Sequence, residues 1–261
     1  MTEPFVLVQL SDPHIGGTWA AGDPTAGWRA AIEAVGRLLQ RPAAVLVSGD
    51  LADHASDAEY AVVTSGLAAL DAPAYVLPGN HDDRTRLREH FELPGEPLEL
   101  VRYAIDFGAL RLVVIDTTKP GCDDGEVGPE QLDWLEAELS AAPHQVTLLA
   151  MHHPPFVTGL PACDAVGLAA SDRVELEKIV SRHPQVRRIL SGHTHRAITA
   201  ELAGRTAISS PSTYAQGRLR LDTNELEVFD EPAGFAVHAV YETEVVSHIQ
   251  PVTAEVPPAS N

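Results

Sequence analysis

The sequence predicts an α/β fold for one main domain, and three observations lead to this prediction. Short runs rich in Val, Ile and Leu, which suit buried strands, alternate along the chain with longer segments of helical periodicity. This alternation requires crossover connections between strands. The 261 residues are enough to form a sizeable core. Polar motifs follow five of the apolar runs, at the strand ends where α/β sheets gather their ligands.

Six short apolar runs are predicted as the buried strands of this fold. They cover residues 5–10, 43–47, 74–77, 110–115, 146–151 and 186–190. Four longer segments between them repeat apolar residues at helical spacing and are predicted as helices. They cover residues 27–41, 56–70, 129–142 and 171–183.

Single residues indicate where these helices begin and which face is apolar. Pro129 stands near a first-turn position, where its missing N–H costs nothing. Ser171-Asp172 is a candidate N-terminal cap for the last helix. The apolar face of the first helix includes Trp28 and Leu39, and that of the last helix includes Val174. We expect Trp28 to lie in the core.

The pattern changes after Arg196, where helical periodicity gives way to short strand-like runs. Residues 206–210, 218–221, 225–229 and 235–241 are separated by Gly, Asn and Pro turns. We expect these runs to be antiparallel strands that complete a second sheet. The last segment, 251–261, contains three prolines and no apolar periodicity, which predicts a flexible C-terminal tail after a domain spanning 1–250.

The charge balance limits the range of partners. The chain has 18 Lys and Arg against 37 Asp and Glu, a formal net charge of −19. An excess of this size argues against binding long nucleic acid or an anionic membrane through the general surface. An anionic substrate would therefore need a local positive site.

The cysteines and the N-terminus indicate the compartment. Cys122 and Cys163 are the only cysteines, too few to suggest a disulfide framework, and we expect both to be reduced. No signal peptide is recognisable in the first residues, and no apolar run approaches the ~18–20 residues of a membrane span. We predict a cytoplasmic protein.

The five motifs carry the chemistry of this sequence. They are Asp12-Pro13-His14, Gly49-Asp50, Gly79-Asn80-His81-Asp82, His152-His153-Pro154-Pro155 and Gly192-His193-Thr194-His195. A lone His-x-His can be a surface pair, and a single Asp or Asn after a strand is usually a turn residue. Five consecutive motifs with carboxylate, amide and imidazole groups predict instead a two-metal site.

The spacing within the motifs suggests how each side chain reaches an ion. Asp12 and His14 are two residues apart, so in an extended segment they point the same way. The Asp50 carboxylate can bridge two ions, with one oxygen to each. Asn80 offers a neutral oxygen after Gly79, which we expect to allow a tight turn.

Four further residues near the motifs have less certain roles. His153 is adjacent to a predicted ligand and points elsewhere, which favours a supporting role over coordination. Asp82 and Asp116 are equally consistent with hydrogen-bond acceptors behind the ligands and with simple caps. Trp19 either lines the mouth of the site or has no role in it.

The motifs D-x-H, G-D, G-N-H-D, H-H-P-P and G-H-x-H, in this order, resemble the calcineurin-like metallophosphoesterase superfamily. They span Asp12 to His195, about three quarters of the chain, and none is missing. The resemblance implies a four-layer αββα sandwich, in which helices flank two mixed sheets. This architecture agrees with the predicted order of strands and helices.

The resemblance also assigns the ligands. It implies one metal held by Asp12, His14, Asp50 and His195. It implies a second metal held by Asp50, Asn80, His152 and His193. The sequence does not choose among iron, manganese and zinc, as divalent or mixed-valence ions, because this donor set suits each. His81 is not a ligand in this family and is expected to contact the phosphoryl group and to protonate the leaving alkoxide.

Chain length and the segments D-P-H-I-G-G, G-N-H-D-D-R and M-H-H-P-P resemble most the branch of class III cyclic nucleotide phosphodiesterases and bacterial glycerophosphodiesterases. The resemblance implies hydrolysis of small phosphodiesters, such as cyclic nucleotides, by a hydroxide that bridges the two ions. Glycerophosphodiesterase or phosphomonoesterase activity is the alternative. A non-catalytic scaffold is disfavoured because all seven ligands and His81 are present. The sequence leaves homo-oligomerisation open.

Overall fold

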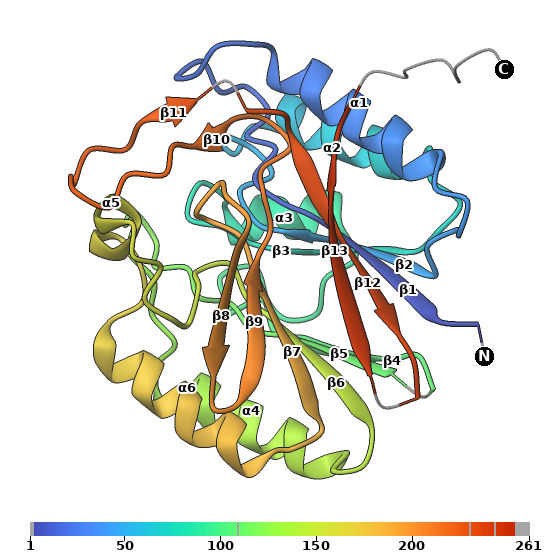
Figure 1. Cartoon of the computed structure of the whole chain (residues 1–261), viewed down its shortest axis with the longest axis vertical. Helices are drawn as coiled ribbons and strands as arrows, with labels where there is room; N and C mark the ends of the chain where they lie inside the picture. The colour runs from blue at the N-terminus through green and yellow to red at the C-terminus, as the bar shows by residue number, and fades with distance from the viewer. Residues whose placement is uncertain (1–2, 109, 230, 243, 254–261) are drawn as a thin grey trace, which may run out of the picture.

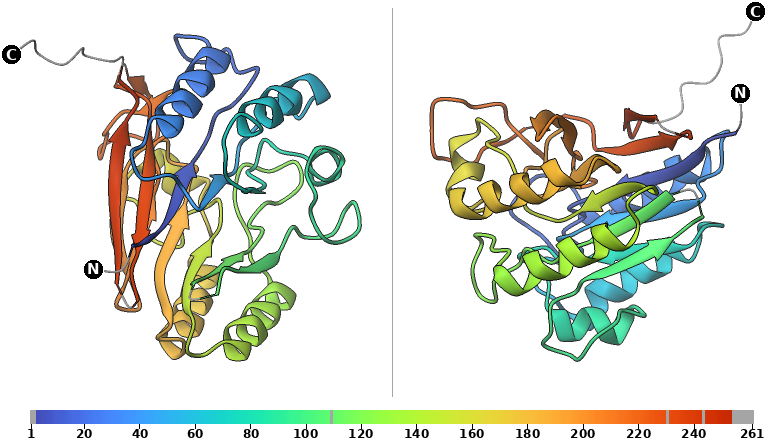
Figure 2. Two further views of the ribbon diagram at one scale, coloured as in Figure 1. Left: turned by 90° about the vertical axis from the view of Figure 1, so that its right-hand side faces the viewer. Right: turned by 90° about the horizontal axis from the view of Figure 1, so that it is seen from below.

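Two large β-sheets stacked face to face form the centre of the structure, a computed structural model that describes residues 3–108, 110–229, 231–242 and 244–253. Helices cover the outer face of each sheet, so that the molecule has four layers (Figures 1 and 2). This is the αββα sandwich that the sequence predicted.

The first sheet has the strand order β13-β12-β1-β2-β3. Its strands are β1 (Phe5–Leu10), β2 (Ala44–Ser48), β3 (Ala74–Leu77), β12 (Gly234–Val240) and β13 (Val245–Pro251). The first three run parallel, and β12 pairs with β1 antiparallel. Its helices are α1 (Pro24–Gly36), α2 (Asp57–Leu67) and α3 (Arg84–His90).

The second sheet has the strand order β4-β5-β6-β7-β9-β8. Its strands are β4 (Tyr103–Asp106), β5 (Leu110–Val114), β6 (Val146–Ala150), β7 (Val186–Ser191), β8 (Ile198–Leu202) and β9 (Arg205–Ser209). The four central strands are parallel, and the edge strands β4 and β8 are antiparallel. Helices α4 (Pro129–Ala141) and α6 (Ala170–Arg182) cover its outer face.

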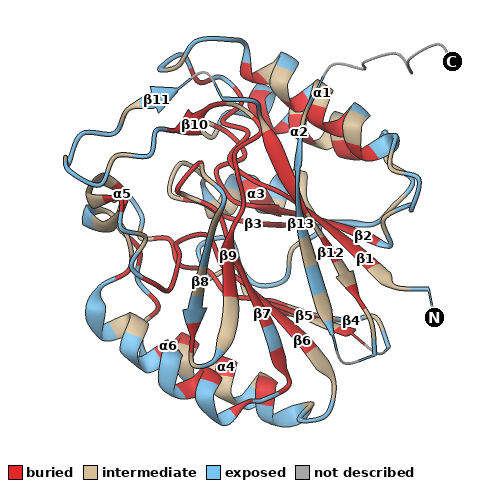
Figure 3. Ribbon diagram, in the orientation of Figure 1, coloured by how far each residue is buried: buried red, intermediate tan, exposed pale blue. Residues whose placement is uncertain are grey.

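Three apolar layers explain why the predicted strands are so uniformly hydrophobic. Val6 and Val8 of β1 pack toward the helices, whereas Leu7 between them packs toward the second sheet. Because strand side chains alternate between faces, a strand buried on both faces needs a continuous apolar run. The buried residues accordingly form a continuous band through the strands in Figure 3.

Helix boundaries and faces differ from the sequence prediction at three places. The first helix ends at Gly36, and Leu39 beyond it is fully exposed (105%). Val174 of α6 is also exposed, although Trp28 is buried as expected. The N-cap of α6 is Ala169, with no side-chain cap, so the predicted Ser-Asp cap was wrong. Asp172 instead accepts a hydrogen bond from the backbone N–H of Val127.

The C-terminal strands are distributed differently from the prediction. Strands β8 and β9 complete the second sheet. Strand β12 belongs instead to the first sheet, where it pairs with the edge of β1 that β2 leaves free. Residues 218–221 are not a strand; β10 (Gln216–Gly217) and β11 (Val228–Phe229) form a separate two-stranded ribbon.

The end of the described chain belongs to the first sheet. Strand β13 extends to Pro251, and the N–H of Val252 donates to the carbonyl of Ala233. Of the predicted tail, residues 254–261 lie outside the described residues. In the part of the chain that the structure describes, no helix has the length and apolar character needed to cross a membrane.

Candidate metal centre

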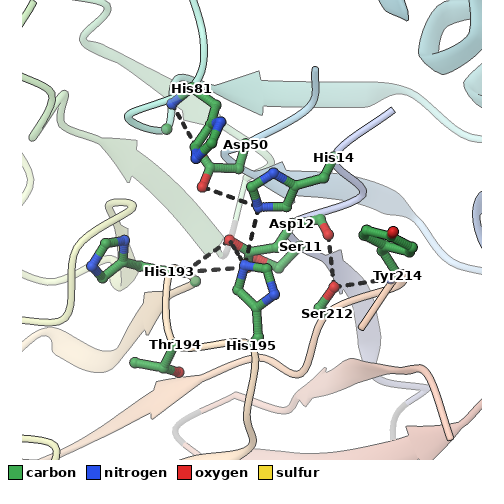
Figure 4. Close-up of polar contacts among 12 residues, drawn as sticks. Ser11, Asp12, His14, Asp50, His81, His193, Thr194, His195, Ser212 and Tyr214 are labelled. Carbon is green, nitrogen blue, oxygen red and sulfur yellow. Dashed lines mark hydrogen bonds and ion pairs between the residues drawn. The ribbon is translucent and has the colours of Figure 1, made fainter. Parts of the chain in front are cut away.

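The loops that follow β1, β2, β3, β6 and β7 meet at one end of the two sheets. Figure 4 shows side chains from four of these loops: Asp12, His14, Asp50, His81, His193 and His195. Backbone hydrogen bonds join these loops: the N–H of Asp12 donates to the carbonyl of Gly49, and the N–H of Gly192 donates to that of His152. The strand ends of both sheets therefore bring all five motifs together, as the sequence predicted.

Left-handed backbone is concentrated at the predicted ligands. Seven non-glycine residues within the described chain have positive φ, and five of them are predicted ligands. These five, with φ between 42° and 68°, are Asp12, His14, Asp50, His193 and His195. Residues other than Gly, Asn and Asp rarely adopt this backbone conformation, and backbone strain of this kind is common at functional sites. The segment from Asp12 to His14 is therefore not extended, contrary to our expectation.

The motif glycines allow neighbouring loops to approach closely. A Cβ atom on Gly49 would lie 2.3 Å from Nδ1 of His152, and one on Gly192 would lie 2.2 Å from Oγ of Ser11. A Cβ on Gly79 would lie 2.1 Å from Oδ1 of Asp50. Gly79 does not have positive φ, so the reason for this glycine is space rather than a tight turn.

Four predicted ligands form a first cluster. Each of Asp12, His14, Asp50 and His195 offers one ligand atom, and these atoms lie within 4.8 Å of one another. Nε2 of His14 is 3.3 Å from Oδ2 of Asp50, and Nε2 of His195 is 3.5 Å from Oδ1 of Asp12. The resemblance grouped the same four residues around one ion.

The remaining predicted ligands form a second cluster around the amide oxygen of Asn80. Oδ1 of Asn80 is 3.1 Å from Nε2 of His152 and 3.1 Å from Nδ1 of His193. Nε2 of His152 is also 3.4 Å from Oδ2 of Asp50. Asp50 thus lies between the two clusters.

The Asp50 carboxylate is oriented differently from the prediction. Its Oδ2 atom faces His14 and His152, the histidines of both clusters, whereas its Oδ1 atom accepts a hydrogen bond from the backbone N–H of His81 (2.9 Å). Oδ2 is therefore the Asp50 oxygen that lies near histidines of both clusters.

Hydrogen bonds behind the histidines orient their lone pairs toward the clusters. Nδ1 of His14 lies 2.9 Å from Oδ1 of Asp53, that of His152 lies 2.9 Å from the Ser48 carbonyl, and that of His195 lies 3.0 Å from the Ala215 carbonyl. Carbonyl and carboxylate oxygens only accept, so each Nδ1 carries the proton. Each Nε2 lone pair then points into the site, the arrangement typical of histidine ligands.

The donor set fits cations. With protons on Nδ1, the Nε2 atoms of His14 and His195 place two lone pairs 3.0 Å apart, beside two carboxylates. Oδ1 of Asn80 likewise faces the Nε2 lone pair of His152 at 3.1 Å. Acceptors converging at these distances repel one another unless positive charge lies between them. The site is a possible dimetal centre, in accordance with the predicted cofactors, and its donors do not specify the metal.

The electrostatic field at the site attracts positive charge. Burial opposes the charged form of His14, but the carboxylates of Asp50, Asp53 and Asp12 together outweigh burial and raise the pKa of His14 to about 10. His152 behaves in the same way, with a pKa raised to about 9. Burial lowers the pKa of His195 to about 4. The negative potential that favours a proton on His14 and His152 also favours a metal ion at the same place.

His81 lies beside the first cluster without belonging to it. Its ring centroid is 4.6 Å from that of His14, and its Nδ1 atom donates to the backbone carbonyl of Asp53 (3.1 Å). The side chain is partly exposed and lines the cavity over the site. His81, His14 and Asp53 offer ligand atoms within 4.8 Å of one another, and His81 is the most exposed of the three.

Asp53 is a site residue that the sequence prediction missed. Its Oδ1 atom accepts hydrogen bonds from Nδ1 of His14 and Nε1 of Trp19, both at 2.9 Å, and lies 3.5 Å from Nδ1 of His81. One carboxylate therefore orients a predicted ligand, a residue at the mouth and the predicted proton donor. Its position three residues after Asp50 was the only sequence signal.

The residues with open roles make hydrogen bonds to the surrounding loops, and His153 also lies in a group with His152 and His193 whose ligand atoms are within 4.8 Å of one another. Both ring nitrogens of His153 have hydrogen-bond partners, Thr117 Oγ1 (2.9 Å) and the Asp123 carbonyl (3.0 Å), and burial lowers its pKa to about 3. Asp82 accepts from the backbone N–H groups of Leu51, Ala52 and Gly79, and so ties the loop after β2 to the loop after β3.

Asp116 stabilises a neighbouring loop rather than the centre. It is fully buried, pairs with Nε of Arg84 at 2.8 Å, and accepts from the backbone N–H groups of Val101 and Thr118.

A cavity of about 380 Å³ opens over the site. Its lining includes five of the predicted ligands, His81 and Trp19, together with Cys163, Val166 and Leu226. Trp19 is 40% exposed and its ring packs edge-on against His14 and Tyr214. A larger cleft of about 650 Å³ opens between the edge strands β3 and β4, but its described lining contains none of the motif residues.

Residues 5–197 match the sequence profile of the family described as calcineurin-like phosphoesterase. A cAMP/cGMP dual specificity phosphodiesterase of Mycobacterium tuberculosis is 36% identical over 81% of this chain and 69% of that protein. A probable cyclic nucleotide phosphodiesterase of Synechococcus is 34% identical over 80% of this chain and 81% of that protein.

Other similar proteins carry different names. A glycerophosphodiester phosphodiesterase of Enterobacter lignolyticus is 33% identical over 81% of this chain and 78% of that protein. A dimetal phosphatase from Danio rerio superposes with a TM-score of 0.74, covering 96% of this chain and 98% of that chain, at 17% identity. At this identity the likeness shows the fold alone.

Proposed function

The chain belongs to the calcineurin-like phosphoesterase family and is a metal-dependent phosphoric ester hydrolase, and from this premise we propose that it hydrolyses small phosphodiesters such as cyclic nucleotides at a two-metal centre. One ion would be held by Asp12, His14, Asp50 and His195. The second would be held by Asp50, Asn80, His152 and His193. When bound, two such ions lower the pKa of water and polarise phosphoryl oxygens.

His81 is the proposed proton donor to the leaving alkoxide. Its Nδ1 proton is committed to the Asp53 carbonyl at 3.1 Å. The neutral ring therefore has only a lone pair on Nε2, and the imidazolium form is the one that can donate from this atom. The backbone N–H of His81 also donates to Oδ1 of Asp50, so the predicted proton donor is held directly against a predicted ligand.

The dimensions and charge of the site favour a small substrate. A cavity of about 380 Å³ is near the lower end of the range for small-molecule sites. The surrounding chain carries a net charge of −19, so long nucleic acid would be repelled outside the centre. Small diesters should be cleaved far better than duplex DNA at physiological salt. A preference for duplex DNA would contradict this part of the proposal.

The apolar residues that line the cavity are the observation that favours a cyclic nucleotide. Trp19 is 40% exposed, and its ring is held by the hydrogen bond of its indole N–H to Asp53 at 2.9 Å and by contacts with the rings of His14 and Tyr214. Val166 and Leu226 also line the cavity. Such a surface suits stacking and apolar contact with a nucleobase, which contributes about 1–3 kcal/mol per base in other proteins. A glycerol group would gain little from it.

The names of the relatives support glycerophosphodiesters as a second substrate class, and Trp19 provides the test. We would compare kcat/KM for 3′,5′-cAMP, 2′,3′-cAMP and a glycerophosphodiester in wild type, Trp19→Phe and Trp19→Leu. Loss of stacking in Trp19→Leu should reduce kcat/KM for the cyclic nucleotides by about 5–150-fold, the equivalent of 1–3 kcal/mol, with less effect on the glycerophosphodiester.

Trp19→Phe is the matched control, because it keeps an aromatic ring and removes the hydrogen bond to Asp53. If both variants lose the same activity on every substrate, the bond to Asp53 rather than stacking explains the effect. Equal turnover of all three diesters by the wild type would contradict the preference for nucleotides. A cytoplasmic location and homo-oligomerisation stay predictions, which cell fractionation and light scattering test.

A further inference from the structure

A second cavity contains arginine side chains at the opposite end of the sheets from the metal centre. Strand β7 runs from Val186 to Ser191 and continues into the predicted ligand His193, and the cavity lies near its beginning. The parallel strand β9 begins beside it, and so does β13, at the lower end of both sheets in Figure 1. The volume of this cavity is about 440 Å³.

The described lining of this cavity has an excess of positive charge. It contains three arginines and one carboxylate, and we call it the arginine cleft: Arg187, Arg188, Gly204, Arg205, Thr206, Glu244, Val245 and Val246. The excess is unexpected in a chain with a formal net charge of −19. Neither Arg188 nor Arg205 forms an ion pair with Glu244, or with any other carboxylate of the described residues.

Arg188 is a buried cation whose hydrogen bonding is incomplete. The residue is 9% exposed, and one of its terminal nitrogens donates to the backbone carbonyl of Val245. Its Nε atom is buried and has no hydrogen-bond partner among the described residues. Burial lowers the pKa of the guanidinium, and no carboxylate opposes that shift. A buried charge without a counter-charge destabilises the fold.

Arg205 has the same deficiency one strand away. Its Nε atom is also buried without a partner in the described chain, and its Nη1 atom makes only a long contact of 3.4 Å with the neighbouring Gly204 carbonyl. Strands β7 and β9 are adjacent and parallel, with Arg188 opposite Thr206. Arg205 is one residue out of register with Arg188, and both side chains line the cleft where the two strands begin.

Other partly buried arginines of the described chain have partners for their donors. Arg84 pairs with Asp116 at 2.8 Å and Arg111 pairs with Glu138. Arg88 and Arg173 donate to backbone carbonyls instead. Among the arginines of the described residues, only Arg188 and Arg205 have a buried Nε atom without a hydrogen-bond partner.

We propose that the arginine cleft, which Arg188 and Arg205 both line, binds a small phosphate-bearing anion. Guanidinium groups present planar pairs of donors that match phosphate oxygens, and a phosphate dianion would balance two of them. The volume of about 440 Å³ is sufficient for a mononucleotide as well as for free phosphate. The phosphoryl group is the chemistry shared by both, and the site is independent of the catalytic centre.

Titration calorimetry of the full-length, metal-loaded protein at constant ionic strength tests this proposal, with inorganic phosphate as the first ligand and AMP as the second. Phosphate should bind at two classes of site. The class at the metal centre should disappear in Asp50→Ala, and the class at the arginine cleft should disappear or weaken in Arg205→Gln. The expected weakening is on the order of tenfold to a hundredfold, the equivalent of one charge-assisted hydrogen bond.

Arg41→Gln is the matched control, since Arg41 is exposed, pairs with Asp71 and carries the same charge. It should leave both classes of site unchanged. Tighter binding of AMP than of phosphate at the cleft would identify a nucleotide site, and equal binding would show that only the phosphoryl group is recognised. Unchanged phosphate binding in both Arg205→Gln and Arg188→Gln would overturn the proposal, as would a single class of site that disappears in Asp50→Ala.

Discussion

His14 and His195 face each other with their Nε2 atoms 3.0 Å apart, while the Nδ1 atom of each is committed to an acceptor, Asp53 in one case and the Ala215 carbonyl in the other. Two lone pairs at this separation require a cation between or beside them. Without a metal ion, a proton on one ring satisfies the pair, which agrees with the high pKa of His14 and the low pKa of His195. Metal binding at this centre should therefore release protons.

Metal content tests the predicted ligand set. Purified wild-type protein should contain close to two transition-metal ions per chain. Asp50→Ala should lose both, because Oδ2 of Asp50 lies within 3.4 Å of histidines from the two clusters. Elemental analysis after gel filtration measures the stoichiometry. Asp71→Ala, an exposed carboxylate change, is the control. Two fully occupied sites in Asp50→Ala would refute the assignment of Asp50 as the bridge.

Asp53 should matter through His14 rather than by binding an ion itself. Asp53→Ala removes the acceptor that orients the His14 ring and should weaken binding of one ion by about 10–100-fold, the usual effect of losing such a partner. Asp53→Asn keeps an acceptor oxygen and should recover part of the affinity. Competition with a metal chelator measures both variants. Equal affinity in wild type and Asp53→Ala would exclude this role.

His81→Ala should retain its metals, because the described contacts of the His81 side chain are with Asp53 and the His14 ring rather than with an ion site. On a diester with an alkoxide leaving group, the variant should lose on the order of 10²–10⁴ in rate, the usual contribution of general acid catalysis. The loss should be smaller with bis(p-nitrophenyl) phosphate, whose leaving group needs little protonation. Equal losses on both substrates would mean that His81 stabilises phosphoryl charge instead.

Gly192→Ala should damage the centre through crowding. The added Cβ would lie 2.2 Å from Oγ of Ser11, 2.8 Å from Oδ2 of Asp12 and 2.8 Å from the Ser48 carbonyl. The backbone carbonyl cannot rotate away, so we expect a destabilisation of about 1–3 kcal/mol and reduced metal content. Gly36→Ala, which meets nothing within 4 Å, should be neutral or stabilising by about 0.4–1 kcal/mol. Urea unfolding compares the two variants; wild-type stability and metal content in Gly192→Ala would show that the loops can separate.

The sequence predicted the convergence of the site because the convergence depends on strand order and direction. Each motif directly follows a short apolar run, and parallel strands end at the same edge of a sheet. The positions of Asp12, Asp50, Asn80, His152 and His195 could therefore be inferred without coordinates.

The details that the sequence did not reveal depend on contacts between distant segments. Asp53 acquires its role only when its loop meets His14 and Trp19, and no local pattern distinguishes it from a solvated carboxylate. The left-handed backbone at His14 and His195 is unfavourable locally and is imposed by the surrounding loops. The pairing of β12 with β1 joins residues more than 220 positions apart, and local periodicity does not encode such a choice of edge.

His238 predicts a specific dependence of stability on pH. Its ring is fully buried between Gln9 and Ser247, and burial, with help from the nearby charges of Arg188 and His248, lowers its pKa to about 3. The unfolded chain, in which histidine has a pKa near 6.5, therefore binds this proton more readily than the folded chain. Stability from this group is fully present above pH ~6.5 and is lost as the pH falls toward 3, by up to about 1.4 kcal/mol per pH unit.

In urea unfolding at fixed metal concentration, the free energy of unfolding of His238→Gln should therefore decline less steeply between pH 6.5 and 5 than that of wild type, whatever its absolute stability. His144→Gln, a change at an exposed histidine, should keep the wild-type slope. Identical slopes in wild type and His238→Gln would mean that the buried ring accepts a proton through local opening, without unfolding of the two sheets that enclose it.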